Sequence, residues 1–177
     1  MEKDERDMRK ILIVVDMQND FIDGALGTAE AQKIVPEVKR VIDTFKGDIY
    51  FTRDTHGESY MNTQEGRNLP VPHCIKGSNG WEISSALDTF VAKGIIDKPS
   101  FGYLNIADEI AKSGTDIEEI TLVGLCTDIC VISNAMILKA AFPETVISVV
   151  ASACAGVTPE SHQNALEAMK MCQIIVI

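Results

Sequence analysis

The chain has 177 residues, of which 46% are hydrophobic and 24% are charged, and its formal net charge is −10 at pH 7. This composition predicts one globular domain over residues 1–177 and excludes a disordered chain or a small disulfide-held scaffold. The acidic balance argues against a nucleic-acid partner, because phosphate contacts require clustered lysine and arginine side chains.

The beginning of the chain indicates where the protein works. The first ten residues, MEKDERDMRK, are charged and contain no apolar core, and no later apolar run approaches the roughly twenty residues of a membrane span. The five cysteines are an odd number without scaffold-like spacing, which suits a compartment where thiols stay reduced. We therefore expect a cytoplasmic protein with no membrane partner.

Short apolar runs alternate with helical patterns along the rest of the chain. The first run is the unbroken, β-branched segment 10–15, which is typical of a parallel strand covered on both faces. Similar runs lie at residues 48–52, 120–123, 146–150 and 174–177. Helical patterns lie between the runs, at residues 29–45, 103–113, 128–141 and 159–171. The alternation predicts a three-layer α/β/α, Rossmann-like domain with a central, mostly parallel sheet of five to six strands.

Residues 53–84 do not follow this alternation. The segment has little periodicity and contains two of the three histidines and the only tryptophan. A loop of that length in a compact domain usually has a function. Ligands of open parallel sheets bind beyond the carboxyl ends of the strands, so we expect Asp16, this loop and Cys130 to meet at one crevice.

A cysteine follows the strand expected at residues 120–123. Gly124 allows a tight bend, Thr127 is expected as the N-cap of the next helix, and Cys130 then lies in the first helical turn. The positive end of the helix dipole would favour a reactive thiolate there. The alternative is a buried structural cysteine, and only partner residues elsewhere can decide between the two.

Two charged residues are candidate partners of this cysteine. Asp16 ends the first strand, where a carboxylate could accept the thiol proton, although in DMQNDFIDG it could equally begin a turn. Lys98 lies between an apolar pair and a proline, and most lysines are simply solvated. A lysine close to Asp16 and Cys130 would instead stabilise both a thiolate and the anion on an attacked carbonyl.

The irregular loop contains a candidate metal site formed by Asp54, His56, Glu65 and His73. Two imidazoles and two carboxylates can bind zinc, iron or manganese and leave positions for water and substrate. Asp54 and His56 would lie on the same side of an extended segment, which favours chelation. A polar loop without metal is the alternative. Cys74 ranks below His73 as a ligand, because a thiolate suits hard carboxylates poorly.

In combination, these residues resemble the isochorismatase-like cysteine hydrolases, and within them the nicotinamidase/pyrazinamidase branch, over nearly the whole chain. The segment VDMQNDF at residues 15–21 is similar to the first motif of the family and implies Asp16 as the catalytic acid/base. The segment GLCTDICV implies Cys130 as the nucleophile, and the lysine of the family's triad falls on Lys98.

The resemblance also implies a geometry for the turn before the nucleophile. The bond from Leu125 to Cys126 is where the family has a non-proline cis peptide. The backbone N–H groups of Cys126 and Cys130 would form the oxyanion hole, in which each donor typically contributes about 3 to 4 kcal/mol of transition-state stabilisation.

The loop DTHGESYMNTQEGRNLPVPHC resembles the metal segment of nicotinamidases. It implies Asp54, His56 and His73 as ligands of a divalent ion, with zinc expected first, and Glu65 as a fourth ligand at a position that varies in the family. Phe21 and Trp81 match the aromatic residues that sandwich a flat substrate ring, although either could equally belong to the core. Phe101 stands where nicotinamidases often carry tyrosine. The expected substrate-binding residues are Phe21, Trp81, Phe101, Tyr103 and Leu125.

The sequence therefore predicts hydrolysis of a small carboxamide, most closely of nicotinamide to nicotinate and ammonia, through a thioester on Cys130. The closest alternative is an isochorismatase-type hydrolase or one acting on carbamoyl compounds, although isochorismatase-type members lack the loop ligands. A non-catalytic metal or redox protein using Cys126 and Cys130 as a dithiol is a further alternative, but redox dithiols usually have a shorter spacing. The resemblance implies a homodimer or homotetramer.

Overall fold

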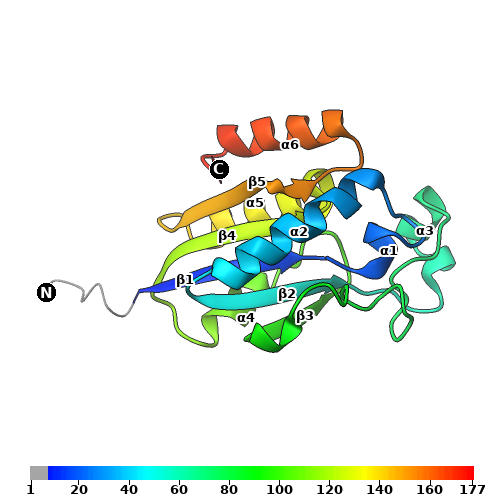
Figure 1. Cartoon of the computed structure of the whole chain (residues 1–177), viewed down its shortest axis with the longest axis horizontal. Coiled ribbons are helices and arrows are strands. Elements are labelled where there is room, and N and C mark those ends of the chain that lie inside the picture. Colours follow the sequence, from blue (N-terminus) through cyan, green and yellow to red (C-terminus); the bar gives the residue numbers. More distant parts are fainter. Residues whose placement is uncertain (1–7) are drawn as a thin grey trace, which may run out of the picture.

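The computed structural model describes residues 8–177, which form a six-stranded parallel sheet in the order β3-β2-β1-β4-β5-β6, with helices on both faces (Figure 1). The charged segment 1–7, on which the expectation about the start of the chain rests, lies outside the described residues. The strands are β1 (Arg9–Val15), β2 (Asp48–Asp54), β3 (Gly94–Lys98), β4 (Ile117–Leu125), β5 (Val146–Ala155) and β6 (Ile175–Val176). The α-helices are α1 (Asn19–Ile22), α2 (Ala29–Thr44), α3 (Gln64–Asn68), α4 (Ile106–Ala111), α5 (Ile132–Ala141) and α6 (Pro159–Met171).

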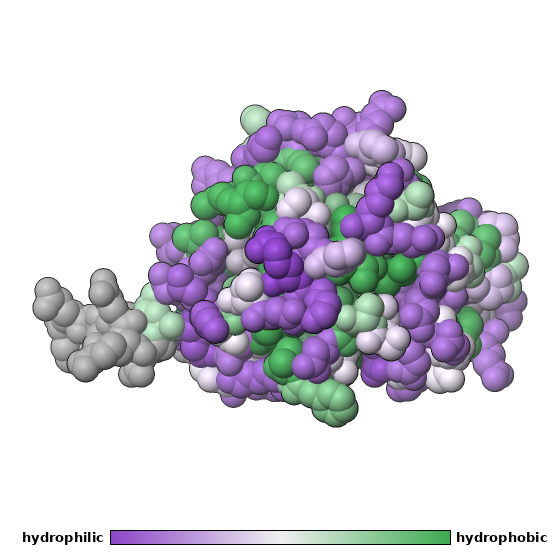
Figure 2. All heavy atoms as spheres, viewed as in Figure 1, coloured by the Kyte–Doolittle hydropathy of each residue, from purple (hydrophilic) through white to green (hydrophobic). Residues whose placement is uncertain are grey.

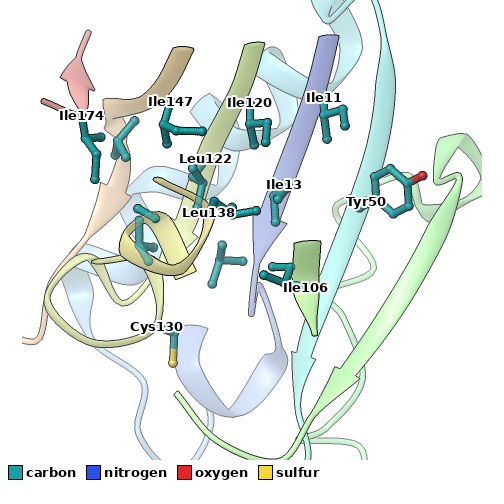
Figure 3. Close-up of a cluster of buried hydrophobic side chains, with 14 of the residues drawn as sticks. Ile11, Ile13, Tyr50, Ile106, Ile120, Leu122, Cys130, Leu138, Ile147 and Ile174 are labelled. Carbon is teal, nitrogen blue, oxygen red and sulfur yellow. The ribbon is translucent and has the colours of Figure 1, made fainter. Parts of the chain in front are cut away.

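The side chains of the central strand divide between two hydrophobic layers. Because successive residues of a strand point to opposite faces, Ile11 and Ile13 of β1 face a cluster formed with α4, α5 and α6 (Figure 3). Leu12 and Val14 face a second cluster, in which the apolar stripe of α2 covers the sheet. All these side chains are fully buried. This pattern explains the unbroken apolar run of β1 and confirms the predicted three-layer α/β/α architecture.

The structure extends or corrects several predicted elements. The strand Gly94–Lys98 is missing from the predictions because it is a half-polar edge strand with little periodicity. β2 continues through Asp54 into the segment expected as loop, and that segment also contains the short helix α3. The helix expected at residues 103–113 is shortened to α4. The expected N-cap role of Thr127 is wrong, because this residue already lies inside the first helical turn.

Within residues 8–177, no helix combines enough length with enough apolar character to cross a bilayer. The face shown in Figure 2 is mainly hydrophilic, with apolar patches scattered between charged side chains.

Gly124 provides a test of how tightly β1 and β4 approach each other. It has a φ of +117°, and a Cβ at this position would collide with the carbonyl oxygen of Val15 in the neighbouring strand. We predict that Gly124→Ala lowers the free energy of unfolding by about 2 kcal/mol or more, measured by urea denaturation. Gly57→Ala is the matched control, since a Cβ there has no heavy atom within 4 Å. Equal stability of the two variants would contradict this account.

Candidate active site

Asp16 occupies a constrained position directly after β1. Its backbone is left-handed, with a φ of 47°, and its side chain is fully buried. Thr52 of β2 donates a hydrogen bond from Oγ1 to Oδ1 of Asp16 at 2.6 Å. Burial raises the pKa of Asp16, although the positive charge of Lys98 opposes that rise. A carboxyl group in this environment is suited to accept and return a proton.

The ammonium group of Lys98 lies at the centre of the buried polar side chains. Lys98 ends β3, and its Nζ is 2.7 Å from Oδ2 of Asp16 and 3.4 Å from Oδ1 of Asp54. The same atom is 3.5 Å from Sγ of Cys130 and donates to the Ser100 carbonyl at 3.1 Å. Burial alone would lower the pKa of Lys98, but the surrounding negative charges, with Asp16 first among them, raise it well above its ordinary value. Asp16 and Cys130 therefore both contact the buried ammonium group of Lys98, which brings the three side chains together.

Cys130 lies in a widened helical turn that follows β4. The Leu125–Cys126 peptide is cis, in agreement with the resemblance. Residues Thr127–Val131 then form the π-helix η4, which runs directly into α5. The Val131 N–H donates to the Cys126 carbonyl at 3.0 Å, five residues back along the chain. Figure 3 shows the Cys130 sulfur at the edge of the core cluster, pointing away from the other labelled side chains.

The surroundings of Cys130 favour its protonated thiol. Burial raises the pKa of Cys130 well above its ordinary value, and the Asp16 charge adds to the rise while Lys98 opposes it. Loss of hydration thus works against the thiolate that the helix terminus is expected to favour. Attack by the sulfur requires a base that takes its proton during the reaction.

The four candidate metal ligands lie together beside the lysine. One potential ligand atom from each of Asp54, His56, Glu65 and His73 lies within 4.8 Å of the others. Nε2 of His56 is 2.8 Å from Oδ2 of Asp54 and 3.5 Å from Oε1 of Glu65. Nε2 of His73 is 3.6 Å from the same Asp54 oxygen and 3.7 Å from the same Glu65 oxygen. All four side chains thus direct an oxygen or nitrogen at one small volume.

The surroundings of this cluster fit a divalent cation. Nδ1 of His73 is 2.8 Å from the Val71 carbonyl, so the ring donates there and leaves the Nε2 lone pair facing the cluster. Asp54 is shared, since Oδ1 faces Lys98 while Oδ2 faces the two histidines. Contacts to these partners outweigh burial and hold the pKa of Asp54 well below its usual range. Two imidazoles and two carboxylates form a donor set suited to zinc, iron or manganese.

Gln18 is a buried residue of the site that the sequence predictions omit. Its Oε1 accepts a hydrogen bond from the Asp54 N–H at 2.7 Å, and its Nε2 donates to the carbonyls of Asp54 and Trp81 at 2.9 Å each. The side chain of Gln18 therefore bonds both the N–H and the carbonyl of Asp54. Its position inside VDMQNDF is the signal that could have identified it.

Asn134, one helical turn after Cys130, is a second buried residue of the site that the sequence predictions omit. Its Nδ2 donates to the carbonyls of Cys130 at 2.8 Å and Phe101 at 3.0 Å, and its Oδ1 accepts from the Tyr103 N–H at 3.0 Å. These bonds tie the segment after β3 to the helix that carries the cysteine. A polar residue on the buried face of a predicted helix is the signal in this case.

One cavity of about 570 Å³ joins the two groups of side chains. Asp54, Glu65 and His73 line it on the metal-ligand side, and Cys126 and Cys130 line it on the side of the turn. Most of the remaining wall is apolar. Its residues lie in loops and at the ends of helices, so the hydrophobic periodicity of the sequence does not reveal that they line a cavity. These wall residues include Phe21, Leu26, Leu69, Phe101, Ile129 and Val157.

Three of the five expected substrate-binding residues do not line this cavity. The Trp81 ring donates from Nε1 to Oγ1 of Thr55 at 2.9 Å and stacks under the Arg53 guanidinium, 3.6 Å from the ring centroid. Tyr103 packs against the hydrophobic cluster below α5. Leu125 belongs to the cluster covered by α2 and is buried. Phe21 and Phe101 are the two that reach the cavity wall.

Comparisons with known proteins identify relatives that share this architecture. The chain is 32% identical to the pyrazinamidase of Pyrococcus horikoshii, solved in complex with zinc, with a TM-score of 0.81 over 96% of this chain and 98% of that one. It is 26% identical to the nicotinamidase/pyrazinamidase of Mycobacterium tuberculosis over 95% of this chain and 98% of that protein. It is 28% identical to the N-carbamoylsarcosine amidase of Thermoplasma acidophilum, with a TM-score of 0.77 over 96% of this chain and 95% of that one.

The family itself follows from the extent of the match. A model of the isochorismatase domain matches residues 10–177, which include every strand and helix of the sheet and its covering layers except the first residue of β1. The resemblance inferred from VDMQNDF and GLCTDICV is confirmed by this match. The chain belongs to the isochorismatase family.

Proposed function

We propose that this protein is a cysteine-dependent amidohydrolase that converts nicotinamide and water to nicotinate and ammonia. The observation that carries the proposal is the position of the Lys98 ammonium, which contacts Asp16, Asp54 and Cys130. Asp54 and Cys130 also line one cavity. An acid/base, a thiol and a fixed positive charge are the groups that acyl transfer through a thioester requires. The M. tuberculosis nicotinamidase/pyrazinamidase supports the choice of substrate.

The first half of the proposed reaction forms a thioester. Asp16 accepts the proton of Cys130 as the sulfur attacks the amide carbon, and the carbonyl oxygen becomes an anion. The backbone N–H groups of Cys126 and Cys130 donate to this oxygen. The intermediate then collapses, the carbon–nitrogen bond breaks, and Asp16 gives its proton to the leaving ammonia.

The second half restores the thiol. Water attacks the thioester carbon while Asp16 accepts a proton from it, and the carbon–sulfur bond breaks. The proton on Asp16 returns to the sulfur, and the product leaves as the carboxylic acid, which ionises in water. Throughout both halves, Lys98 stays protonated and offsets the negative charge that moves between Asp16, the sulfur and the oxyanion.

We further propose that Asp54, His56, Glu65 and His73 hold a divalent ion, most closely zinc. Support comes from the convergence of their ligand atoms and from the zinc complex of the P. horikoshii pyrazinamidase. Such an ion would supply a Lewis acid at the substrate end of the cavity. Phe21 and Phe101, on the apolar wall, are the proposed contacts of the aromatic ring.

A carbamoyl-compound hydrolase is the second candidate function, because the T. acidophilum N-carbamoylsarcosine amidase has the same fold. The same acid/base, thiol and lysine would serve that reaction. The redox alternative is weaker, since burial raises the pKa of Cys126 to about 12 and a redox-active dithiol needs an accessible thiolate.

The setting of the enzyme is part of the same proposal. All five cysteines lie within the described residues and are free, which supports a reducing compartment such as the cytoplasm. A homodimer or homotetramer stays a prediction, and light scattering on the purified protein measures it.

The nucleophile assignment predicts the behaviour of Cys130→Ala. Loss of the sulfur should lower ammonia release from nicotinamide by at least about 1,000-fold, because no thioester can form. The circular dichroism spectrum should match that of the unaltered protein, since only one buried atom is removed. Cys172→Ala is the control, because that thiol is exposed and should be dispensable. Turnover by Cys130→Ala at the rate of the unaltered protein would rule out the nucleophile.

The substrate and the metal are tested together by an ammonia-release screen of small amides and carbamoyl compounds, with and without a chelator. We expect nicotinamide to be hydrolysed, the activity to fall by at least about tenfold after chelation, and added zinc, manganese or ferrous iron to restore it. Release from carbamoyl compounds alone would transfer the assignment to the second candidate. Full activity after proven metal removal would contradict the metal proposal.

A further inference from the structure

We propose that His162 is a positioning residue that holds the oxyanion turn, defined as residues 126–130, through a hydrogen bond to Thr127. His162 is the one histidine outside the proposed metal site. Its Nδ1 is 2.7 Å from Oγ1 of Thr127, and the Thr127 side chain is fully buried. The inference rests on the proposed function, because the role of the turn follows from that reaction.

The bond from His162 reaches Thr127, the second residue of the oxyanion turn. Thr127 is bonded covalently to Cys126, whose N–H is one of the two proposed oxyanion donors, and it lies three residues before the nucleophile Cys130. The N–H groups of Ile129 and Val131 both donate to the single carbonyl of Cys126, at 3.1 and 3.0 Å. These two bonds close the turn on itself but do not tie it to another element. The Thr127 side chain provides such a tie, to α6.

A second contact fixes the same connection. The carboxylate of Asp128 accepts a hydrogen bond from the Val157 N–H, with both oxygens at 3.2 Å. Val157 lies in the link between β5 and α6, next to Gly156, where an added Cβ would lie only 2.8 Å from the His162 backbone nitrogen. The link therefore packs tightly against the backbone of His162.

His162 is not required to cap the helix that carries it. α6 begins with a complete capping box, in which Thr158 and Ser161 each accept from the backbone of the other. The imidazole is thus free to make its bond outside the helix. Burial lowers the pKa of His162, although Asp128 opposes this, so the ring is neutral at pH 7 and shares one hydrogen bond with the Thr127 hydroxyl.

The consequence is mechanistic because the oxyanion forms only during the reaction. Misplacement of a donor by about 1 Å can reduce a rate by about 100-fold. Loosening the turn should therefore lower kcat while substrate binding, which depends on the apolar wall and the metal-ligand side, is largely kept.

Four variants test the bond. Thr127→Val removes the hydroxyl at nearly constant shape, and His162→Leu removes the ring nitrogens. Thr127→Ser and His162→Asn each keep a polar atom near the original position. Gln163→Ala is the matched control on α6, because that side chain is exposed and bonds to Glu167 of its own helix.

We expect Thr127→Val and His162→Leu to lower kcat for nicotinamide by about 10- to 100-fold with KM changed by less than about threefold. Thr127→Ser, His162→Asn and Gln163→Ala should stay within about threefold of the unaltered holoenzyme. The double variant Thr127→Val/His162→Leu should be no slower than either single variant, since both remove the same bond. Additive losses, or a rise in KM at constant kcat, would overturn the proposal.

Hydrogen–deuterium exchange provides a readout that does not depend on the substrate. Peptides covering residues 126–130 should exchange faster in Thr127→Val and His162→Leu than in the two conservative variants, at melting temperatures within a few degrees of each other. Equal exchange in all variants would overturn the positioning role. Faster exchange together with no turnover of nicotinamide by the unaltered protein would instead support the positioning role and count against the proposed substrate.

Discussion

A single buried ammonium group organises this protein. Lys98 is fully buried and lies within 3.5 Å of two carboxylates and a sulfur. A buried charge is tolerated only when it is paired, and removing one partner of such a pair typically costs about 3 to 5 kcal/mol. Asp16 and Asp54 would also repel each other in the absence of the lysine. Asp16, Asp54 and Cys130 are thus held around one positive charge.

The parallel sheet explains how residues far apart in the chain reach that charge. In the strand order β3-β2-β1-β4, the carboxyl ends of neighbouring strands carry Lys98, Asp54, Asp16 and then the turn to Cys130. Parallel strands end at one edge of the sheet, so four segments that span 114 residues from Asp16 to Cys130 lie next to each other. The long segment after β2 then needs to supply only the remaining metal ligands and part of the cavity wall.

The sequence allowed the layers and the meeting of Asp16 with Cys130 to be predicted, because unbroken apolar strands and chain order carry that information. Lys98 was placed beside them only by the resemblance to the family. The half-polar strand β3 was not recognised, since an edge strand needs no apolar run. The resemblance to the family implied Trp81 as a substrate contact, whereas in the structure its ring stacks on Arg53. The sequence marks Gln18 by its motif and Asn134 by its place on a predicted helix, but no local pattern encodes their bonds to the distant carbonyls of Trp81 and Phe101.

The burial of Cys130 has a consequence for the lifetime of the enzyme. Oxidants and alkylating agents react with thiolates, and their selectivity follows thiolate character and exposure. Only 4% of the Cys130 surface is exposed, and burial keeps its pKa high. In the proposed reaction, the sulfur becomes nucleophilic only as its proton passes to Asp16 during attack on a bound substrate. Such a cysteine would be shielded from peroxide damage between turnovers, a durability that a permanently ionised thiol would lack.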